Sequence, residues 1–301
     1  MSSNIFYPSK GACIYCGKSN ILLTDEHIVP FFIGGKNIMR KASCVMCADI
    51  TKKFEQDVAR KLWGDARASY NAPTRRKKER VKSFVLKDPK GVSADLIVSA
   101  EHYPAPMAFY RMSTAGILCG ADPIIDLSLN WTIEMIVDAT RLKEFEAKHP
   151  DRLTSRFTNE PKSFARMLTK IGHSQVMTAL DHGDFTPICL PYILGKKSNI
   201  SYVVGGGSTN DPPQPESGYS LRTVQISTNE STLIVVEVRL LANNDTPTYH
   251  VVVGSVNGKD NMEQVNEKLS KIYPPEEGPS FDLGSAPAGY HWVPSVWPDK
   301  P

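Results

Sequence analysis

The sequence predicts an α+β protein in which a small cysteine-rich module precedes a larger mixed α/β domain with a mainly antiparallel sheet. Three observations support this fold class. Two Cys-x-x-Cys pairs and a helical pattern fill the first 65 residues. Residues 163–180 have the spacing of an amphipathic helix, and four runs rich in β-branched residues follow it, separated by turn-forming segments.

The composition is that of a globular protein of about two domains, with 301 residues, 41% hydrophobic and 22% charged. The formal net charge of +3 is only mildly basic, so nucleic-acid binding would require local clusters of positive charge. No apolar run reaches the roughly 18 residues of a membrane span, and the first residues lack the pattern of a signal peptide. We therefore expect a cytoplasmic protein without a membrane segment.

Four of the six cysteines form the two Cys-x-x-Cys pairs, which are Cys13, Cys16, Cys44 and Cys47. Four thiolates at this spacing suit tetrahedral structural zinc, and in a cytoplasmic chain they favour a metal over disulfides. A module this small needs the metal because its own core is too small to stabilise it. The remaining two, Cys119 and Cys189, lie in apolar contexts and are expected to be buried thiols.

The order of elements divides the chain into three parts. A helix is expected from about residue 48 to 62, ending at Gly64, and a basic run over 75–82 follows Pro73 as an exposed linker. We place the module with this linker at 1–87, the mixed α/β domain at 88–273 and a proline-rich tail at 274–301.

Short strands are expected at 83–86, at the end of the linker, and at 96–98, followed by a helical stretch near 131–145. The central helix of the mixed domain buries one apolar stripe, namely Phe164, Met167, Leu168 and Ile171. The later elements are strands at 201–204, 221–226, 232–240 and 249–253 and a helix at 261–272. The glycines 205–207 are interpreted as a flexible turn, and we expect an extended tail with Tyr290, Trp292 and Trp297 docked on a neighbouring surface.

Between the cysteine pairs lies Glu26-His27-Ile28-Val29-Pro30, and the helix after the second pair carries Thr51-x-x-Phe54-Glu55. In this combination the sequence resembles the HNH endonuclease family, in its zinc-stapled subgroup, over about 55 residues. The resemblance implies a ββα-metal module of treble-clef-like form. It also implies metal-dependent hydrolysis of phosphodiester bonds.

The resemblance assigns roles to residues of this module. His27 would be the general base that activates water, and Glu26 a ligand of the catalytic divalent ion, Mg²⁺ or Mn²⁺. Ala48 stands where the family commonly has a second metal ligand; we favour Asp49 as that ligand, while Thr51 and Glu55 share the face of Ala48 and could reach the ion instead.

Two further features surround this motif. Asn37 is the candidate for orienting His27, with a turn residue after Gly34-Gly35 as the alternative. The basic run offers five side chains for the phosphate backbone of DNA, with solvated surface as the alternative: Arg75, Arg76, Lys77, Lys78 and Arg80. Residues 181–184 could form a second metal cluster but are interpreted as a loop after a helix.

In the family that the module resembles, similar cassettes serve as effectors of anti-phage defence, and they also occur in mobile-element and restriction nucleases; the resemblance thus suggests a defence effector, with these nucleases as the alternative. We hypothesise that residues from about 88 onward control cleavage through homo-oligomer formation or through an activating ligand or protein partner. The alternative is a non-catalytic zinc module that binds nucleic acid or a protein. Ala48 favours that alternative, whereas the intact Glu26-His27 pair favours the enzyme.

Overall fold

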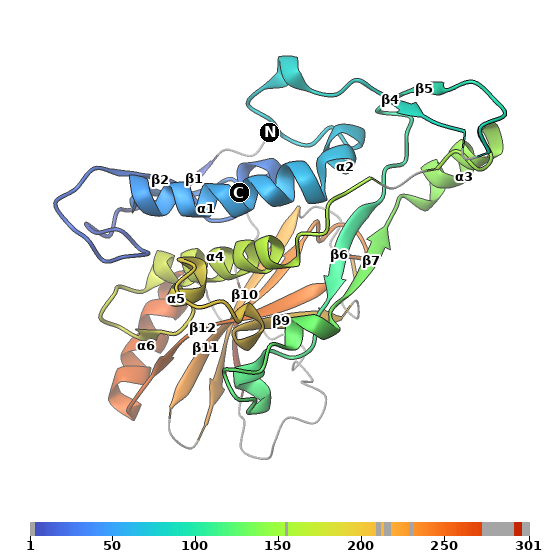
Figure 1. Cartoon of the computed structure of the whole chain (residues 1–301). Coiled ribbons are helices and arrows are strands. Elements are labelled where there is room, and N and C mark those ends of the chain that lie inside the picture. The colour runs from blue at the N-terminus through green and yellow to red at the C-terminus, as the bar shows by residue number, and fades with distance from the viewer. Residues whose placement is uncertain are drawn as a thin grey trace.

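The computed structural model describes residues 4–88, 90–153, 156–208, 212–213, 218–228, 231–272 and 292–296. Its N-terminal part is a three-stranded sheet in the order β1-β3-β2, covered by helix α1 (Figure 1). The bounds are Ile5–Tyr7 for β1, Leu23–His27 for β2, Asn37–Cys44 for β3 and Val45–Asp57 for α1. A short 3₁₀ turn, η1 (Phe31–Ile33), joins β2 to β3. This is the ββα arrangement expected for the module.

Helix α1 starts three residues earlier than expected, directly after Cys44, so that Cys47 lies in its first turn. The expectation that Gly64 ends the helix is wrong. The helix continues as a π turn over Val58–Leu62 (η2) and so ends at Leu62, as expected, but Gly64 begins the next helix, α2 (Gly64–Ser69), instead of terminating this one. The physical reason is that a glycine terminates a helix by adopting a positive φ, and Gly64 is not among the glycines that do so.

A connecting region follows, made of two hairpins and several short helices. Its strands are β4 (Ser83–Leu86), β5 (Leu96–Ser99), β6 (Met107–Arg111) and β7 (Thr132–Ile136), paired β4 with β5 and β6 with β7. Its helices are η3 (Lys77–Glu79), η4 (Gly116–Cys119), η5 (Leu127–Asn130) and α3 (Ala139–Lys148).

The prediction of a helix near 131–145 is therefore wrong for the first half of that range. Thr132, Ile133 and Ile136 are β-branched residues that pair with β6 as a strand. The helix begins only after Asp138, whose carboxylate accepts a hydrogen bond from the amide of Arg141 at 3.0 Å and caps the first turn.

The large sheet has the order β13-β10-β11-β12-β8, with β9 also beside β12, and all its pairings are antiparallel. The bounds are Thr186–Pro187 for β8, Val204–Ser208 for β9, Tyr219–Ser227 for β10, Thr232–Leu240 for β11, Thr248–Val256 for β12 and Trp292–Val296 for β13. The accompanying helices are α4 (Pro161–Ala179), α5 (Leu190–Ile193), η6 (Ile200–Tyr202) and α6 (Lys259–Ile272). A mainly antiparallel sheet in the C-terminal region is thus confirmed.

Two expectations in this region need correction. Residues 200–202 form a 3₁₀ turn rather than a strand, and the glycines interpreted as a flexible turn belong to β9, where Gly205 pairs with His250. The docking expected for Tyr290 and Trp297 falls outside the described residues, while Trp292 begins β13.

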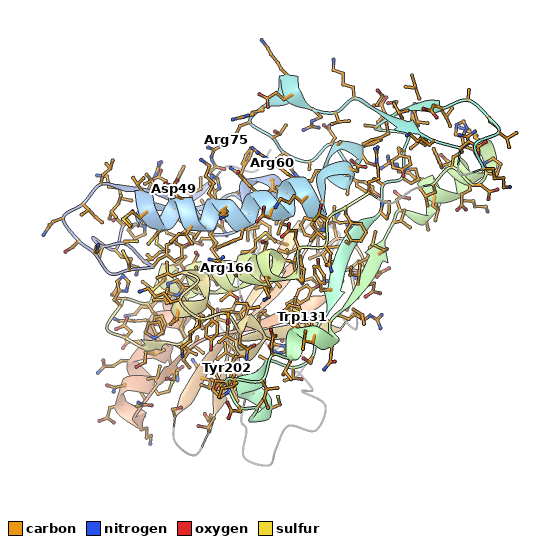
Figure 2. The ribbon with its side chains drawn as sticks, viewed as in Figure 1. Asp49, Arg60, Arg75, Trp131, Arg166 and Tyr202 are labelled. Carbon is orange, nitrogen blue, oxygen red and sulfur yellow. The ribbon has the colours of Figure 1, made fainter. Side chains whose placement is uncertain are left out.

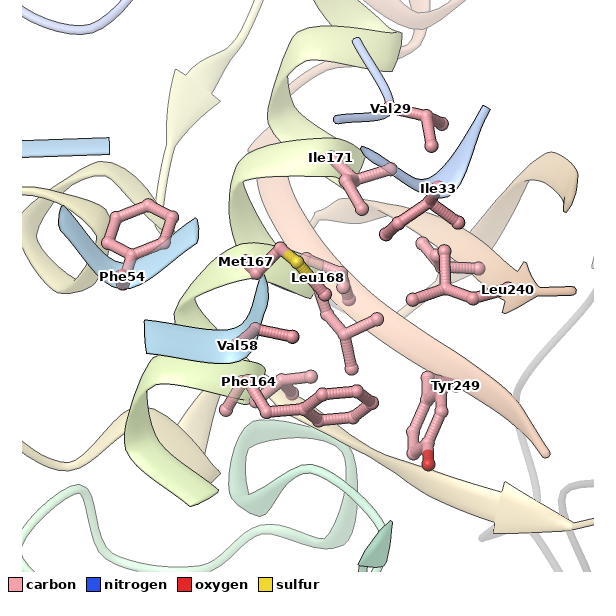
Figure 3. Packing of buried hydrophobic residues seen from close by; sticks show 14 of the residues in the cluster. Val29, Ile33, Phe54, Val58, Phe164, Met167, Leu168, Ile171, Leu240 and Tyr249 are labelled. Carbon is pink, nitrogen blue, oxygen red and sulfur yellow. The ribbon is translucent and has the colours of Figure 1, made fainter. Parts of the chain in front are cut away.

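Helix α4 is the central layer of the molecule, between α1 and the large sheet (Figure 1). A Cβ on Gly172 would lie 3.0 Å from the Cβ of Val251, so the absence of a side chain lets the helix approach β12 closely. Phe164 of α4 meets Tyr249 of β12 with ring centroids 5.4 Å apart, and Val58 of η2 belongs to the same hydrophobic cluster (Figure 3). The predicted apolar stripe is buried, as expected.

One hydrophobic core joins the module to the C-terminal region. It runs from Ile14 and Ile28 through Phe164 to Tyr249, all buried. The indole of Trp63, at the end of η2, donates a hydrogen bond of 2.6 Å to the carbonyl of Ala108 in β6. The module therefore lies packed against the rest of the chain, and the boundary at residue 87 stays a prediction. Within the described residues, no helix is long and apolar enough to cross a membrane.

Candidate active site and metal centre

The four cysteines of the two pairs converge at one end of the N-terminal sheet. Their Sγ atoms all lie within 4.8 Å of one another, and those of Cys16 and Cys44 are 3.8 Å apart. Tetrahedral zinc with bonds of about 2.3 Å to sulfur places its ligand sulfurs about 3.8 Å apart. The four cysteines thus fit a structural zinc ion, which they would surround without an open position. None of the six cysteines is in a disulfide.

The first pair is formed by a tight turn and the second by the start of α1. The amide of Gly17 donates to the carbonyl of Cys13 at 2.8 Å, and the amide of Ile14 donates to Ala42 in β3. Of the two remaining cysteines, Cys189 is buried as expected. Cys119 is exposed, which corrects the expectation, because it ends a short turn at the surface.

His27 ends β2 and lines a cleft of about 1010 Å³ between the module's strand, helix α1 and residues 72–81. Its Nδ1 is buried, whereas Nε2 lies 3.5 Å from a guanidinium nitrogen of Arg75. Partial burial and the nearby charges of Lys170 and Arg75 hold the pKa of His27 below its usual value. The ring is therefore neutral at pH 7 and keeps a proton-accepting nitrogen toward the cleft.

Glu26, the neighbour of His27, is buried and makes an ion pair with Lys170. Lys170 is 1% exposed and comes from helix α4. Its Nζ lies 2.7 Å from Oε1 of Glu26 and 3.0 Å from Oε1 of Glu55 on α1. The sequence did not indicate Lys170 as a residue of the site, because it lies within the helix that was interpreted only as a core element.

The other candidate metal ligands lie along α1. Asp49 is exposed and lines the cleft, and Figure 2 shows it on α1 with Arg60 farther along the helix. Thr51 is buried, and its hydroxyl donates to the carbonyl of Ala48 at 3.1 Å. Glu55 faces Lys170, so of the alternatives on this helix only Asp49 presents an exposed carboxylate to the cleft.

Asn37 is buried in β3, where its carbonyl accepts from the amide of Ile28 at 2.9 Å. It is not among the residues lining the cleft. The backbone near the imidazole is instead that of Gly35, which favours the charged form of His27. A Cβ on Gly35 would lie 1.9 Å from the carbonyl oxygen of Val29, so only glycine fits this approach.

Positive charge lines both sides of the cleft. Arg75, Arg76 and Arg80 of the basic run lie along it, whereas Lys77 and Lys78 do not. Three other basic residues that the sequence analysis did not identify line the cleft, namely Lys52, Arg60 and Arg67. Lys52 of α1 and Arg60 of η2 are eight residues apart in one continuous helix, a spacing that could have identified one face of that helix. The cleft therefore has the local cluster of positive charge that nucleic-acid binding would require and that the net charge of +3 does not indicate.

Residues 181–184 form a loop after α4, as expected. Asp184 pairs with Lys268 at 2.6 Å, and Asp181 pairs with Lys10 at 2.9 Å. Among the residues that the structure describes, the four cysteines are the one group of three or more His, Cys, Asp or Glu side chains gathered closely enough for a metal ion. The acidic loop is therefore explained by ion pairs.

Among known proteins, the module has a match in one family. A family model described as HNH endonuclease matches residues 13–63, which include the four cysteines, His27 and the whole of α1. No curated protein and no solved structure matches the chain. Residues 13–63 thus carry an HNH endonuclease domain, in the place where the motif indicated it.

Proposed function

We propose that this protein is a metal-dependent HNH endonuclease that hydrolyses DNA phosphodiester bonds. The observation that carries the proposal is the position of His27. Its ring lies at the end of β2 in a cleft lined by basic residues from α1 and from residues 75–80, and a duplex backbone requires such positive charge.

In the proposed reaction, the neutral Nε2 of His27 accepts a proton from water, and the resulting hydroxide attacks the phosphorus while the P–O bond to the leaving sugar oxygen breaks; that oxygen takes up a proton from solvent. Nδ1 of His27 is buried, whereas Nε2 lies beside Arg75, which also lines the cleft, so Nε2 is the nitrogen that we propose as the base. Arg75, beside this nitrogen, would pair with a phosphate oxygen and hold the backbone within reach of the base.

The proposed activity requires Mg²⁺ or Mn²⁺, which would stabilise the negative charge that develops on the phosphate and the leaving oxygen. Mg²⁺ in nucleases is held by one or two carboxylates together with substrate phosphates, so a cluster of three protein ligands is not needed. Because Glu26 is engaged by Lys170, Asp49 is the carboxylate that we propose for the ion.

The proposal extends to the C-terminal region, which we propose controls cleavage as part of an anti-phage effector. Support comes from α4, which lies outside the matched residues and reaches the strand end at His27 through Lys170. A displacement of α4, by a ligand, a partner or a second copy of the chain, would therefore act on the site directly.

The test is a plasmid-nicking assay with added Mg²⁺ or Mn²⁺, comparing the wild type with His27→Ala and with His102→Ala. His102 is an exposed histidine outside the cleft and serves as the matched control. We expect His27→Ala to lose cleavage by at least about a hundredfold and His102→Ala to keep it, because general-base catalysis contributes roughly that factor or more. Equal cutting by both variants would remove His27 from the reaction, and a single-stranded RNA substrate in parallel would separate DNA from RNA cleavage.

Ala48 and the pairing of Glu26 with Lys170 favour one other function, a zinc module that binds nucleic acid or a protein without cutting. The same assay distinguishes it from the enzyme. A protein that retards the plasmid in a gel but leaves it intact with every divalent ion is a binding module.

A further inference from the structure

Four oxygen atoms surround the ammonium group of Lys170. Two are the carboxylate oxygens Oε1 of Glu26 and Glu55, at 2.7 and 3.0 Å. The other two are the main-chain carbonyls of His27, to which Lys170 also donates, and of Ile28 at 3.4 Å. These oxygens come from the end of β2 and from α1, and the cation comes from α4.

The ammonium is charged in this environment. Lys170 is 1% exposed, and carboxylate oxygens of Glu26 and Glu55 lie within 3.0 Å of its Nζ, so opposite charge surrounds the group. An isolated charge in the protein interior is costly, whereas one surrounded by hydrogen-bonded opposite charge is compensated. The two carboxylates therefore have a buried cation as their partner.

A divalent ion does not fit among the same oxygens. Mg²⁺ requires ligand oxygens at about 2.0–2.1 Å, so an ion shared by Glu26 and Glu55 would lie close to the site that Nζ occupies. Two cations at this separation repel each other strongly in a buried environment. Across the described part of the chain, no third His, Cys, Asp or Glu joins these two carboxylates to complete a metal cluster.

We infer that Lys170 is the resident cation of the Glu26 and Glu55 pair, in place of a divalent ion, and a positioning residue for His27. The ammonium holds the end of β2 through the carbonyls of His27 and Ile28, so that the imidazole stays at the cleft. The assignment of the cation rests on geometry alone, and only the positioning of a base rests on the proposed function.

The neighbouring residues of α4 support a bracing role for this face of the helix. His173, one turn after Lys170, contacts the carbonyl of Ile14 through Nε2 at 2.8 Å. The hydroxyl of Ser174 lies 3.1 Å from that of Tyr15. Both partners lie between the first two zinc cysteines, so one polar face of α4 holds the cysteine turn and the catalytic strand together.

Binding of Mn²⁺ to the full chain, followed by calorimetry and by electron paramagnetic resonance, tests the cation. Lys170→Met keeps the length of the side chain but removes its charge, and Lys162→Met makes the same change at an exposed position of α4. We expect Lys170→Met to bind one additional Mn²⁺ per chain, at least about tenfold more tightly than any ion gained by Lys162→Met, because both carboxylates are freed. Its melting temperature should also rise more with Mn²⁺ than that of the wild type. Unchanged Mn²⁺ binding in a folded Lys170→Met overturns the inference.

Glu55→Gln provides a second test that does not depend on the folding of the lysine variant. The amide keeps an oxygen for Lys170 but is a poor ligand for a divalent ion. We expect the Mn²⁺ affinity of the full chain to stay within about twofold of the wild type. A loss of tenfold or more would assign Glu55 to the metal ion and overturn the inference.

The positioning role is measured separately, by kinetics on a DNA substrate. We expect Lys170→Met to lower kcat by at least about tenfold with KM unchanged, and Lys170→Arg to recover part of kcat, because a displaced base acts on the transition state and not on DNA binding. A rise in KM at unchanged kcat, or no recovery with arginine, would remove this role. If the wild type does not cut DNA, the proposed function fails, whereas the Mn²⁺ results still decide the cation.

Discussion

A guanidinium nitrogen of Arg75 lies 3.5 Å from Nε2 of His27, and the same guanidinium lies over the ring of Phe31 with its carbon 5.5 Å from the centroid. Phe31 in turn meets His27 edge to face at 5.9 Å. Because a positive charge beside a neutral imidazole attracts a phosphate, the proposed function would use this pair for phosphate binding and for proton transfer at one point of the cleft.

Arg75→Gln should weaken DNA binding more than Lys78→Gln, although both belong to the same basic run. Arg75 lines the cleft and Lys78 does not. A residue that contacts one phosphate contributes about one unit to the slope of log Kd against log salt concentration. We expect Arg75→Gln to lower that slope by about one unit and Lys78→Gln to leave it unchanged. Binding titrations at several salt concentrations measure both, and equal slopes would place the phosphate elsewhere.

One tightly bound zinc per chain is expected, because four cysteines at this geometry close a tetrahedral site. Cys47→Ser should lose the ion and much of the stability of the module, since metal binding contributes to its folding. Cys119→Ser is the matched control, because that cysteine lies outside the cluster. Elemental analysis and thermal unfolding of the two variants give the answer. Full zinc content in Cys47→Ser would contradict the assigned site.

The free energy of unfolding should decrease as the pH is lowered below about 6.5, because two histidines are buried. Burial lowers the pKa of both His173 and His250 to about 4. Between pH 6.5 and 4 the unfolded chain binds protons that the folded chain excludes, so the folded state loses stability as the pH falls and keeps it above that range. Each histidine contributes at most about 1.4 kcal/mol per pH unit.

Urea unfolding at pH 7.0, 5.5 and 4.5 measures this loss. His250 accepts a hydrogen bond from the amide of Ala115 at 3.0 Å through Nε2, and the amide oxygen of a glutamine can take that role. We expect His250→Gln to show a shallower decline than the wild type, by about one proton. An identical pH dependence in the variant would exclude His250 from the effect.

A fragment of residues 1–87 should cut DNA at least about tenfold more slowly than the full chain, because it lacks Lys170 and exposes Trp63 and Phe54, which are buried against the rest of the chain. Plasmid nicking at equal concentration tests this, with zinc content and circular dichroism as controls for folding. A folded fragment that cuts faster than the full chain would show instead that the C-terminal region inhibits the module. Sizing of both proteins reports whether two copies assemble.

Local spacing in the sequence determined the parts of this protein whose signals lie close together in the chain. The two cysteine pairs predicted the metal site, and the motif around His27 predicted the strand that ends at the cleft. The apolar spacing of Phe164, Met167, Leu168 and Ile171 predicted α4, and strand β11 has the expected bounds. These features depend on helical or strand periodicity and on ligand spacing, which a single segment contains.

Only the tertiary structure decided which group faces Glu26. Lys170 lies between Thr169 and Ile171 in a helix that is buried on nearly all sides, and helical periodicity does not indicate which distant carboxylates would surround its ammonium. The approach of Gly35 to Val29, and the joining of α1 with residues 75–80 into one cleft, likewise depend on packing between segments. Such contacts form because burial requires each charge to find a partner and each backbone to fit its neighbours, conditions that are met only in the folded chain.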